Sequence, residues 1–368
     1  MDILLSLPFL SYFFSTSLTS WSTSLNLVFF YMTWSTLVLS HSPLKIEILG
    51  TTALRLIFWL APSLLFLAFD TLVPSLAKDI KYNGASALPP RDAKSLSRLL
   101  GLALFNFALE TAVEAGFSLS LATLTKSPVF RTSTTLPLPW QIIKHLGILF
   151  TARELLTYTI HRYLLHGHPL PTTTRGSHTS SKTPSRTLTN LHTNHAHARA
   201  GSPPFSLQLK TDHPLPYVLH HFLPIYLPAL ALHYSIPSHN LHLLTYLLFI
   251  ALTTLEETLS HSGYTIIPGI VMGGMVRRTA VHYAAAGKKT RGGSGSGRGA
   301  GNFGSWGVVD WVCGTSLGGD VMGDLREEAE KHRVRERGEK KAGEVGGMVR
   351  EGVEGWRGKR RGKGSGRG

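Results

Sequence analysis

The chain has 368 residues, of which 43% are hydrophobic and only 16% charged, yet 37 lysines and arginines against 22 acids give a net charge of +15. An average soluble domain carries about 25% charged residues, so charge is scarce here and must be unevenly distributed. The single cysteine, Cys313, excludes a disulfide framework and a cysteine-rich zinc module. With 18 histidines in the chain, any bound metal would be held by imidazole and carboxylate groups.

Six stretches approach the length of about 20 apolar residues that crosses a bilayer. They are Leu25–Leu39, Leu54–Leu72, Leu99–Leu124, Trp140–Ile160, Tyr217–His233 and Leu241–Leu259. We expect the first four to cross the membrane and the last two to enter it and return as a hairpin. The predicted fold class is therefore all-α: a polytopic membrane protein with about four transmembrane helices, a membrane hairpin and a cytosolic, histidine-rich helical cap.

Basic residues indicate how these helices are oriented, because loops rich in lysine and arginine tend to stay in the cytosol. The segments Lys78–Arg98 and His161–Asp212 and the chain after Arg277 are all basic. A cytosolic N-terminus followed by four spans places all three on the cytosolic side. The same orientation brings the histidine clusters to one membrane face.

The first histidine cluster follows the fourth apolar stretch, where His161 and His166 stand near Glu154. Glu154 and His161 are seven residues apart and share one face of a helix. A carboxylate within a span is costly, so we expect Glu154 to orient a ligating imidazole by accepting its second N–H. His161 and His166 are five residues apart, off one face of an ideal helix. Gly167 and Pro169 end the helix here, and His166 could swing back from a frayed turn.

Further histidines come at the ends of the later apolar stretches. His192 and His195 share a helix face, and His197 lies off it. The remaining clusters are Asp212-His213, His220-His221, His261 and His282. A lone histidine carries little information, but clusters that converge on one membrane face indicate a metal site. Sites of several imidazoles suit iron, zinc or copper.

The order of these motifs resembles the fatty acid hydroxylase / sterol desaturase superfamily of integral-membrane oxygenases. The similarity runs from about Trp140 to Thr315. The matching histidines are His161 and His166 in the first box, His192 and His195 in the second, His261 before the third box and His282 within it. Three further segments resemble the family's His-Pro stretch and closing signature: Asp212-His213-Pro214, Asn302-Phe303-Gly304 and Asp310-Trp311 with Gly314-Thr315.

The chain departs from the family pattern at three positions. Ala196 stands where the second box ends in histidine, and Thr279 and Tyr283 stand where the third box has histidines. We expect His197 or His213 to fill the gap left by Ala196. Because Thr279 cannot replace an imidazole, the site could hold two irons, a single metal or none.

The resemblance implies O2-dependent oxidation of a lipid, by hydroxylation or desaturation of a sterol or an acyl chain, at a di-iron centre in the endoplasmic reticulum membrane. Electrons would come from cytochrome b5 or an NAD(P)H-dependent reductase. Glu154 and Asp212 would orient the metal ligands. The implied ligands are His161, His166, His192, His195, His197, His213, His261 and His282.

The resemblance also divides the chain into three parts. Residues 1–139 are N-terminal transmembrane helices, and 140–318 are a hydroxylase-like domain interrupted by a glycine-rich linker at 287–301. Residues 319–368 form a charged, basic tail that we expect to be disordered, apart from a surface helix over Asp324–Lys341. We expect this tail to have no specific nucleic-acid partner.

Three other interpretations remain open at this point. The lost histidines favour a catalytically inactive relative that binds lipid or serves as a scaffold. A metal transporter would use ionisable residues within the spans, such as Asp70, Glu110 and Glu114. A serine hydrolase would use Ser316 in the G-x-S-x-G sequence 314–318, provided that Val308–Val312 before it is a strand.

Overall fold

The computed structural model describes residues 21–167, 184–199, 202–235, 241–266, 272–286 and 300–331, and over these ranges the protein is helical, with two isolated β-bridges and no longer strand. The α-helices are α2 (Trp21–Ser40), α3 (Pro43–Arg55), α4 (Ala61–Leu72), α5 (Pro74–Ile80), α6 (Ala93–Thr125), α7 (Pro139–Thr159), α8 (Pro184–His195), α9 (Pro214–Tyr217), α10 (Leu223–Ser235), α11 (Leu243–Ser260), α12 (Met272–Ala286), α13 (Val308–Val312) and α14 (Val321–Lys331). Three π-helical segments lie at Leu56–Leu60, Ile160–Leu165 and Val218–Phe222, and short 3-10 helices at Gly84–Ala87 and Ser206–Lys210. The all-α fold class expected from the sequence is therefore confirmed for the described residues.

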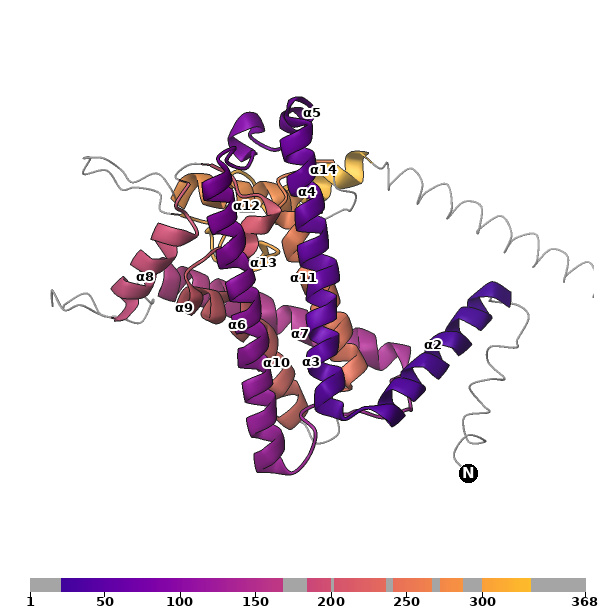
Figure 1. The fold of residues 1–368 in the computed structure, drawn as a ribbon. Helices are drawn as coiled ribbons and strands as arrows, with labels where there is room; N and C mark the ends of the chain where they lie inside the picture. Colours follow the sequence, from indigo (N-terminus) through magenta and orange to yellow (C-terminus); the bar gives the residue numbers. More distant parts are fainter. Residues whose placement is uncertain are drawn as a thin grey trace, which may run out of the picture.

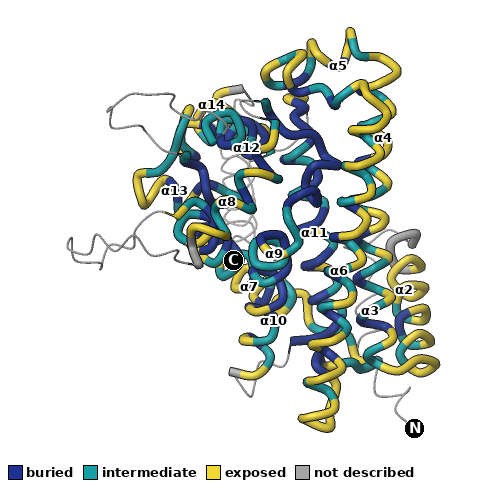
Figure 2. The backbone as a smooth tube through the Cα atoms, turned by 60° about the vertical axis from the view of Figure 1, so that its left-hand side comes forward, coloured by how far each residue is buried: buried dark blue, intermediate teal, exposed yellow. Residues whose placement is uncertain are grey.

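Within the described residues, four helical segments are long and apolar enough to cross a membrane: Pro43–Leu72, Ala93–Thr125, Pro214–Tyr234 and Leu243–Ser260. The first joins α3 and α4 through a π-helical turn, and the two helices form one long rod beside α6 (Figure 1). The third joins α9 and α10 in the same way. Outward faces of α4 and α6 are exposed, whereas most of α11 is buried among its neighbours (Figure 2).

These four segments differ in two members from the set expected from the sequence. Trp140–Ile160 is not among them, because α7 carries Lys144, Arg153 and Glu154 within its 21 residues. α2 contributes only a shorter apolar stretch, Leu25–Ser40. The two arms of the expected hairpin take their place, since each is long enough to cross by itself.

The long segments alternate in direction, so their ends gather at two faces of the bundle. The end that we call the histidine face carries Leu72, Ala93, Pro214 and Ser260, and the end that we call the opposite face carries Pro43, Thr125, Tyr234 and Leu243. Backbone hydrogen bonds tie distant segments together at each end. On the opposite face the amide of Arg131 donates to the carbonyl of Leu241 (3.0 Å), and on the histidine face Tyr82 donates to Gly263 (2.8 Å).

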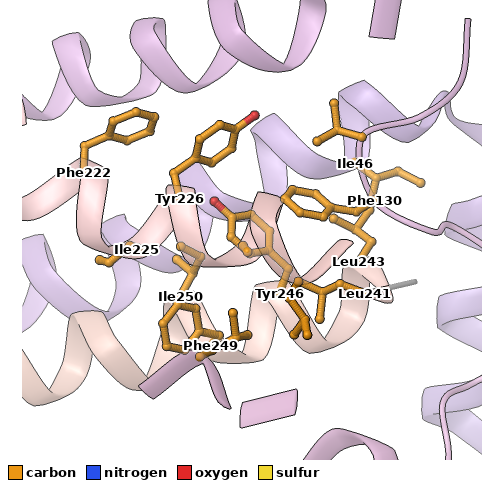
Figure 3. Packing of buried hydrophobic residues seen from close by; sticks show 14 of the residues in the cluster. Ile46, Phe130, Phe222, Ile225, Tyr226, Leu241, Leu243, Tyr246, Phe249 and Ile250 are labelled. Atoms are coloured by element: carbon orange, nitrogen blue, oxygen red, sulfur yellow. The ribbon is translucent and has the colours of Figure 1, made fainter. Parts of the chain in front are cut away.

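An aromatic cluster packs α10 and α11 against α3 and the loop after α6 (Figure 3). The rings of Phe130 and Tyr246 stack with centroids 4.3 Å apart, and Phe222 stacks on Tyr226 at 5.0 Å. Burying rings of this size contributes a large share of the apolar stabilisation of the bundle.

Buried charges also hold the long helices together. Arg55 Nε lies 3.1 Å from Glu110 Oε1, and its Nη1 lies 2.5 Å from Glu114 Oε2. Lys210 Nζ lies 2.6 Å from Glu110 Oε2. Tyr246 donates its hydroxyl to Glu114 Oε1 (2.8 Å). Two cations thus neutralise two carboxylates, and the network joins α3, α6, α11 and the segment before α9.

The acidic residues that a transport pathway would need are therefore already paired with basic side chains. Glu110 and Glu114 share Arg55, and Asp70 pairs with Lys81 and accepts the hydroxyl of Tyr264. None of the three offers an unpaired carboxylate to a passing cation, which weakens the transporter interpretation.

The expected helix at Asp324–Lys341 and the low-complexity segments are covered only in part. α14 begins at Val321 and is described as far as Lys331. The linker at 287–299 and the tail beyond residue 331 lie outside the described residues.

Replacing Arg55 with methionine should destabilise the protein strongly, because Glu110 and Glu114 would stay buried with one cation fewer. We expect the free energy of unfolding to fall by about 3–5 kcal/mol, measured by denaturant unfolding in detergent. The matched control is Arg98→Met, which removes an exposed arginine from α6 and should change it by less than about 0.5 kcal/mol. Equal effects of the two substitutions would contradict the role given to Arg55.

Candidate metal centre

A π-helical segment at the end of α7 brings the first two histidines together. Over Ile160–Leu165 the helix changes its hydrogen bonding, and the amide of His166 donates to the carbonyl of His161 five residues earlier (3.0 Å). Residues five apart then lie nearer to one face than in an α-helix, and the two imidazole centroids lie 4.9 Å apart. The pair therefore meets through a regular π-turn and not through the frayed helix end expected from the sequence.

The end of α8 supplies two more histidines. His192 lies in the last turn of the helix, and His197 lies in the turn that follows it, with their ring centroids 4.9 Å apart. The amide of Ala196 donates to the carbonyl of His192 (2.8 Å), which continues the helix far enough to aim His197 inward. His195 points elsewhere: it packs against His213, with centroids 5.1 Å apart.

These two pairs form a group that could hold a metal ion. One ligand nitrogen from each of the four side chains lies within 4.8 Å of all the others, and His161, His192 and His197 are buried. The group consists of His161, His166, His192 and His197. The nitrogens come from two separate helices, so the tertiary structure assembles the site.

Two further imidazoles border this group. His282 on α12 has its ring centroid 4.6 Å from that of His161 and 5.0 Å from that of His197. His220, in the π-helical segment Val218–Phe222, lies 4.3 Å from His161. The adjacent pair His220-His221 stands out in the sequence, but no ligand role was predicted for it. Two neighbouring histidines at the entry of an apolar helix were the signal available for it.

Fixed acceptors orient three of these rings through Nδ1. Nδ1 of His192 lies 2.6 Å from Asp212 Oδ2, that of His161 lies 3.0 Å from the carbonyl of Phe303, and that of His282 lies 2.7 Å from the carbonyl of Gly301. A carbonyl can only accept, so the ring proton sits on Nδ1 of His161 and His282, and the lone pair is on Nε2. Nε2 of all three rings is buried and has no hydrogen-bond partner. This is the arrangement of a metal-ligating histidine, whose other nitrogen donates to a fixed oxygen.

The loop at 302–306 carries the acceptor of His161, the carbonyl of Phe303, and is itself held in place. Asp310 accepts the amides of Phe303 (2.8 Å) and Gly304 (2.6 Å), and Glu154 Oε2 accepts the amide of Trp306 (2.9 Å). A Cβ at Gly304 would lie 2.5 Å from Glu154 Oε1, so a larger residue there would displace the Glu154 carboxylate. Glu154 thus fixes the loop that carries the acceptor of His161. Among the described residues it makes no hydrogen bond to an imidazole, which is the contact expected from the sequence.

The cluster is electrically suited to a cation. Burial, with a smaller effect from the neighbouring imidazoles, lowers the pKa of His161 and His197 well below the ordinary 6.5, and burial lowers the pKa of His282 to about 4. The rings are therefore neutral at pH 7, and a metal ion can bind without displacing protons from them.

A cavity of about 70 Å³ adjoins the cluster, which is space for a few water-sized groups. His261 lines it and packs against the ring of Tyr283, with centroids 5.9 Å apart. Thr279 and Tyr283, which replace histidines of the family pattern, line the same cavity. His213 caps α9 by accepting the amide of Leu215 (3.3 Å), so it serves the backbone and not the cluster.

The structure contradicts the serine hydrolase interpretation, which requires a strand before Ser316. The segment before Ser316 is α13, Val308–Val312, a helix where a nucleophile elbow needs a strand.

No protein-family model and no solved structure matches this chain. The assignment of the site therefore depends on its own geometry.

The cluster predicts that the purified protein retains about one divalent metal ion per chain when loaded with Fe2+ or Zn2+. His192→Ala should lower the affinity by more than about tenfold, because it removes a ligand and not merely its support. His195→Ala is the matched control, three residues along the same helix with its ring outside the group, and it should retain the metal. Elemental analysis after dialysis measures this, and equal metal loss from both variants would contradict the site.

A second substitution tests how the ligands are oriented. Asp212→Asn keeps the shape of the side chain but loses the carboxylate that faces Nδ1 of His192, so metal affinity should fall by about 10–100-fold. Asp79→Asn, an exposed acid on the same face, should leave the affinity unchanged. Metal titrations of both variants give the comparison, and unchanged affinity in Asp212→Asn would show that this contact does not support the ligand.

Proposed function

We propose that this protein is an iron-dependent oxidoreductase that uses O2 to hydroxylate or desaturate a membrane lipid, with its site on the cytosolic face of the endoplasmic reticulum. The observation that carries the proposal is the convergence of imidazoles in which Nε2 of His161, His192 and His282 and both ring nitrogens of His197 are buried without hydrogen-bond partners. Imidazole ligands suit redox-active iron, because neutral nitrogens can hold the ion in more than one oxidation state. The motif order that resembles the fatty acid hydroxylase / sterol desaturase superfamily supports the same assignment.

The residues present fit such a metal. His161, His166, His192 and His197 would hold it, and His220 and His282 lie close enough to take part. Asp212 and the carbonyls of Phe303 and Gly301 keep the rings aimed inward. Bound iron would supply the one-electron chemistry and the reaction with O2. Burial of His161, His192 and His197 would keep bulk water away from a bound metal.

The position of the cluster favours a lipid substrate. It lies at the histidine face, next to the ends of helices long and apolar enough to cross a membrane. Hydroxylation would convert a C–H bond, O2, two electrons and two protons into a C–OH group and water. The two electrons would come from cytochrome b5 or an NAD(P)H-dependent reductase.

One observation favours a second candidate, a catalytically inactive lipid-binding or scaffold relative. Thr279 and Tyr283 line the cavity where the family pattern has histidines, and the group of four is enough for one ion but leaves a second with few nitrogens. Such a protein would keep the fold and a metal or polar cluster without oxidising lipid.

Lipid analysis of cells that express the protein under heavy-oxygen-labelled O2 separates these candidates. We expect a labelled hydroxylated lipid or a newly desaturated lipid with wild-type protein, its loss with His192→Ala, and its retention with His195→Ala. Identical lipid profiles for wild type and His192→Ala, with metal bound in the wild type, would contradict the oxidoreductase and favour the inactive relative.

A further inference from the structure

A second cavity lies at the opposite face of the bundle, away from the histidine cluster. Its volume is about 200 Å³, and its polar lining consists of Arg131, Thr135, Gln141, His145 and His242. These residues come from the loop after α6, the start of α7 and the residue before α11. None of them takes part in the metal centre.

Backbone and ring contacts build this cavity from several segments. Arg131 forms a bridge with the start of α11: its amide donates to Leu241 (3.0 Å), and its carbonyl accepts from Leu243 (2.9 Å). Trp34 on α2 donates its indole N–H to the carbonyl of Ser133 (3.0 Å). Its ring also packs against His242, with centroids 5.8 Å apart. The walls are therefore fixed independently of any ligand.

The polar groups of the cavity suit an anion. The lining contains a guanidinium, two imidazoles, an amide and a hydroxyl, and no carboxylate. Within the described ranges, no acid lies at ion-pair distance from Arg131. The planar fork of an arginine matches the oxygens of a phosphate group.

One of the neighbours is oriented so that it presents a donor. Gln141 Oε1 accepts the amide of Leu138 (3.3 Å), so the NH2 group of this side chain is its remaining hydrogen-bonding group. Nδ1 of His242 accepts the amide of Leu244 (3.1 Å), so its proton lies on Nε2, which faces Ser133 and Thr135. Arg131 and Gln141 therefore supply N–H groups from two segments.

The surroundings of the cavity favour an anion that carries an apolar chain. The cavity lies near the end of Ala93–Thr125 and the beginning of Leu243–Ser260, two helices long and apolar enough to cross a membrane. Leu138 and Trp140, next to Gln141, are 54% and 71% exposed. Tryptophan is enriched at the level of lipid headgroups. A lipid could place its phosphate among the donors and its chains along this apolar surface.

We propose that the cavity at the opposite face binds the phosphate group of an anionic membrane lipid, with Arg131 as its main contact. The site is independent of the metal centre and of the proposed oxidation. A bound lipid would join α2, α7 and α11 at this face.

The experiment measures binding to the full chain in neutral detergent by native mass spectrometry. The probes are short-chain phosphatidic acid, short-chain phosphatidylcholine and inorganic phosphate. We expect phosphatidic acid to bind more tightly than phosphatidylcholine, and Arg131→Gln to weaken it by about tenfold or more, as for the loss of a charged hydrogen bond. Lys45→Gln removes the same charge from an exposed position on the same face and should leave binding unchanged.

Three results would overturn the proposal. They are equal binding by wild type and Arg131→Gln, an equal loss in Lys45→Gln, and competition by inorganic phosphate as effective as that by the lipid, which would assign the site to free phosphate. Unfolding midpoints of the variants verify that they fold. Should Arg131→Gln fail that test, Gln141→Leu, at an exposed side chain, removes a second donor, and unchanged lipid binding in that variant counts against the site.

Discussion

The ion pairs of Glu110 connect the bundle of long apolar helices to the segment that orients the candidate metal ligands. Glu110 binds Arg55 of α3 on one side and Lys210 on the other. Lys210 lies two residues before Asp212, and Asn106, one helical turn from Glu110, donates to the carbonyls of both (2.8 Å each). Asp212 in turn faces Nδ1 of His192. The position of a ligating imidazole therefore depends on charges buried between the long helices.

Buried polar groups in such a bundle need partners, because neither lipid nor the packed interior can replace the hydrogen bonds of water. The described part of the bundle largely meets this requirement, through the Arg55 network and through the Asp70–Lys81 pair. The histidine cluster is the place where several unpartnered atoms converge: Nε2 of His161, His192, His220 and His282 and both ring nitrogens of His197. A bound cation would lower the cost of burying these nitrogens without partners. The charges of the Arg55 network, in contrast, are paired with one another and need no ligand.

The two faces of the bundle differ in chemistry. The histidine face offers lone pairs on neutral rings in a small cavity, which suits a metal ion. The opposite face offers N–H donors around Arg131 in a larger cavity, which suits an anion. The two cavities share no lining residue.

The sequence by itself determined the helical class, the apolar stretches and which segments carry histidines, because hydropathy and residue type are local properties. The resemblance of the motifs added the expectation that Asp212 orients a metal ligand. Only the tertiary structure decided which rings meet. The π-turn that aligns His161 with His166 leaves no mark in a pattern based on ideal helices, and the choice of His197 over His195 depends on how α8 packs. The pairing of Arg55 with Glu110, 55 positions away, likewise depends on helix packing, and no local property of the chain encodes a contact between such distant residues.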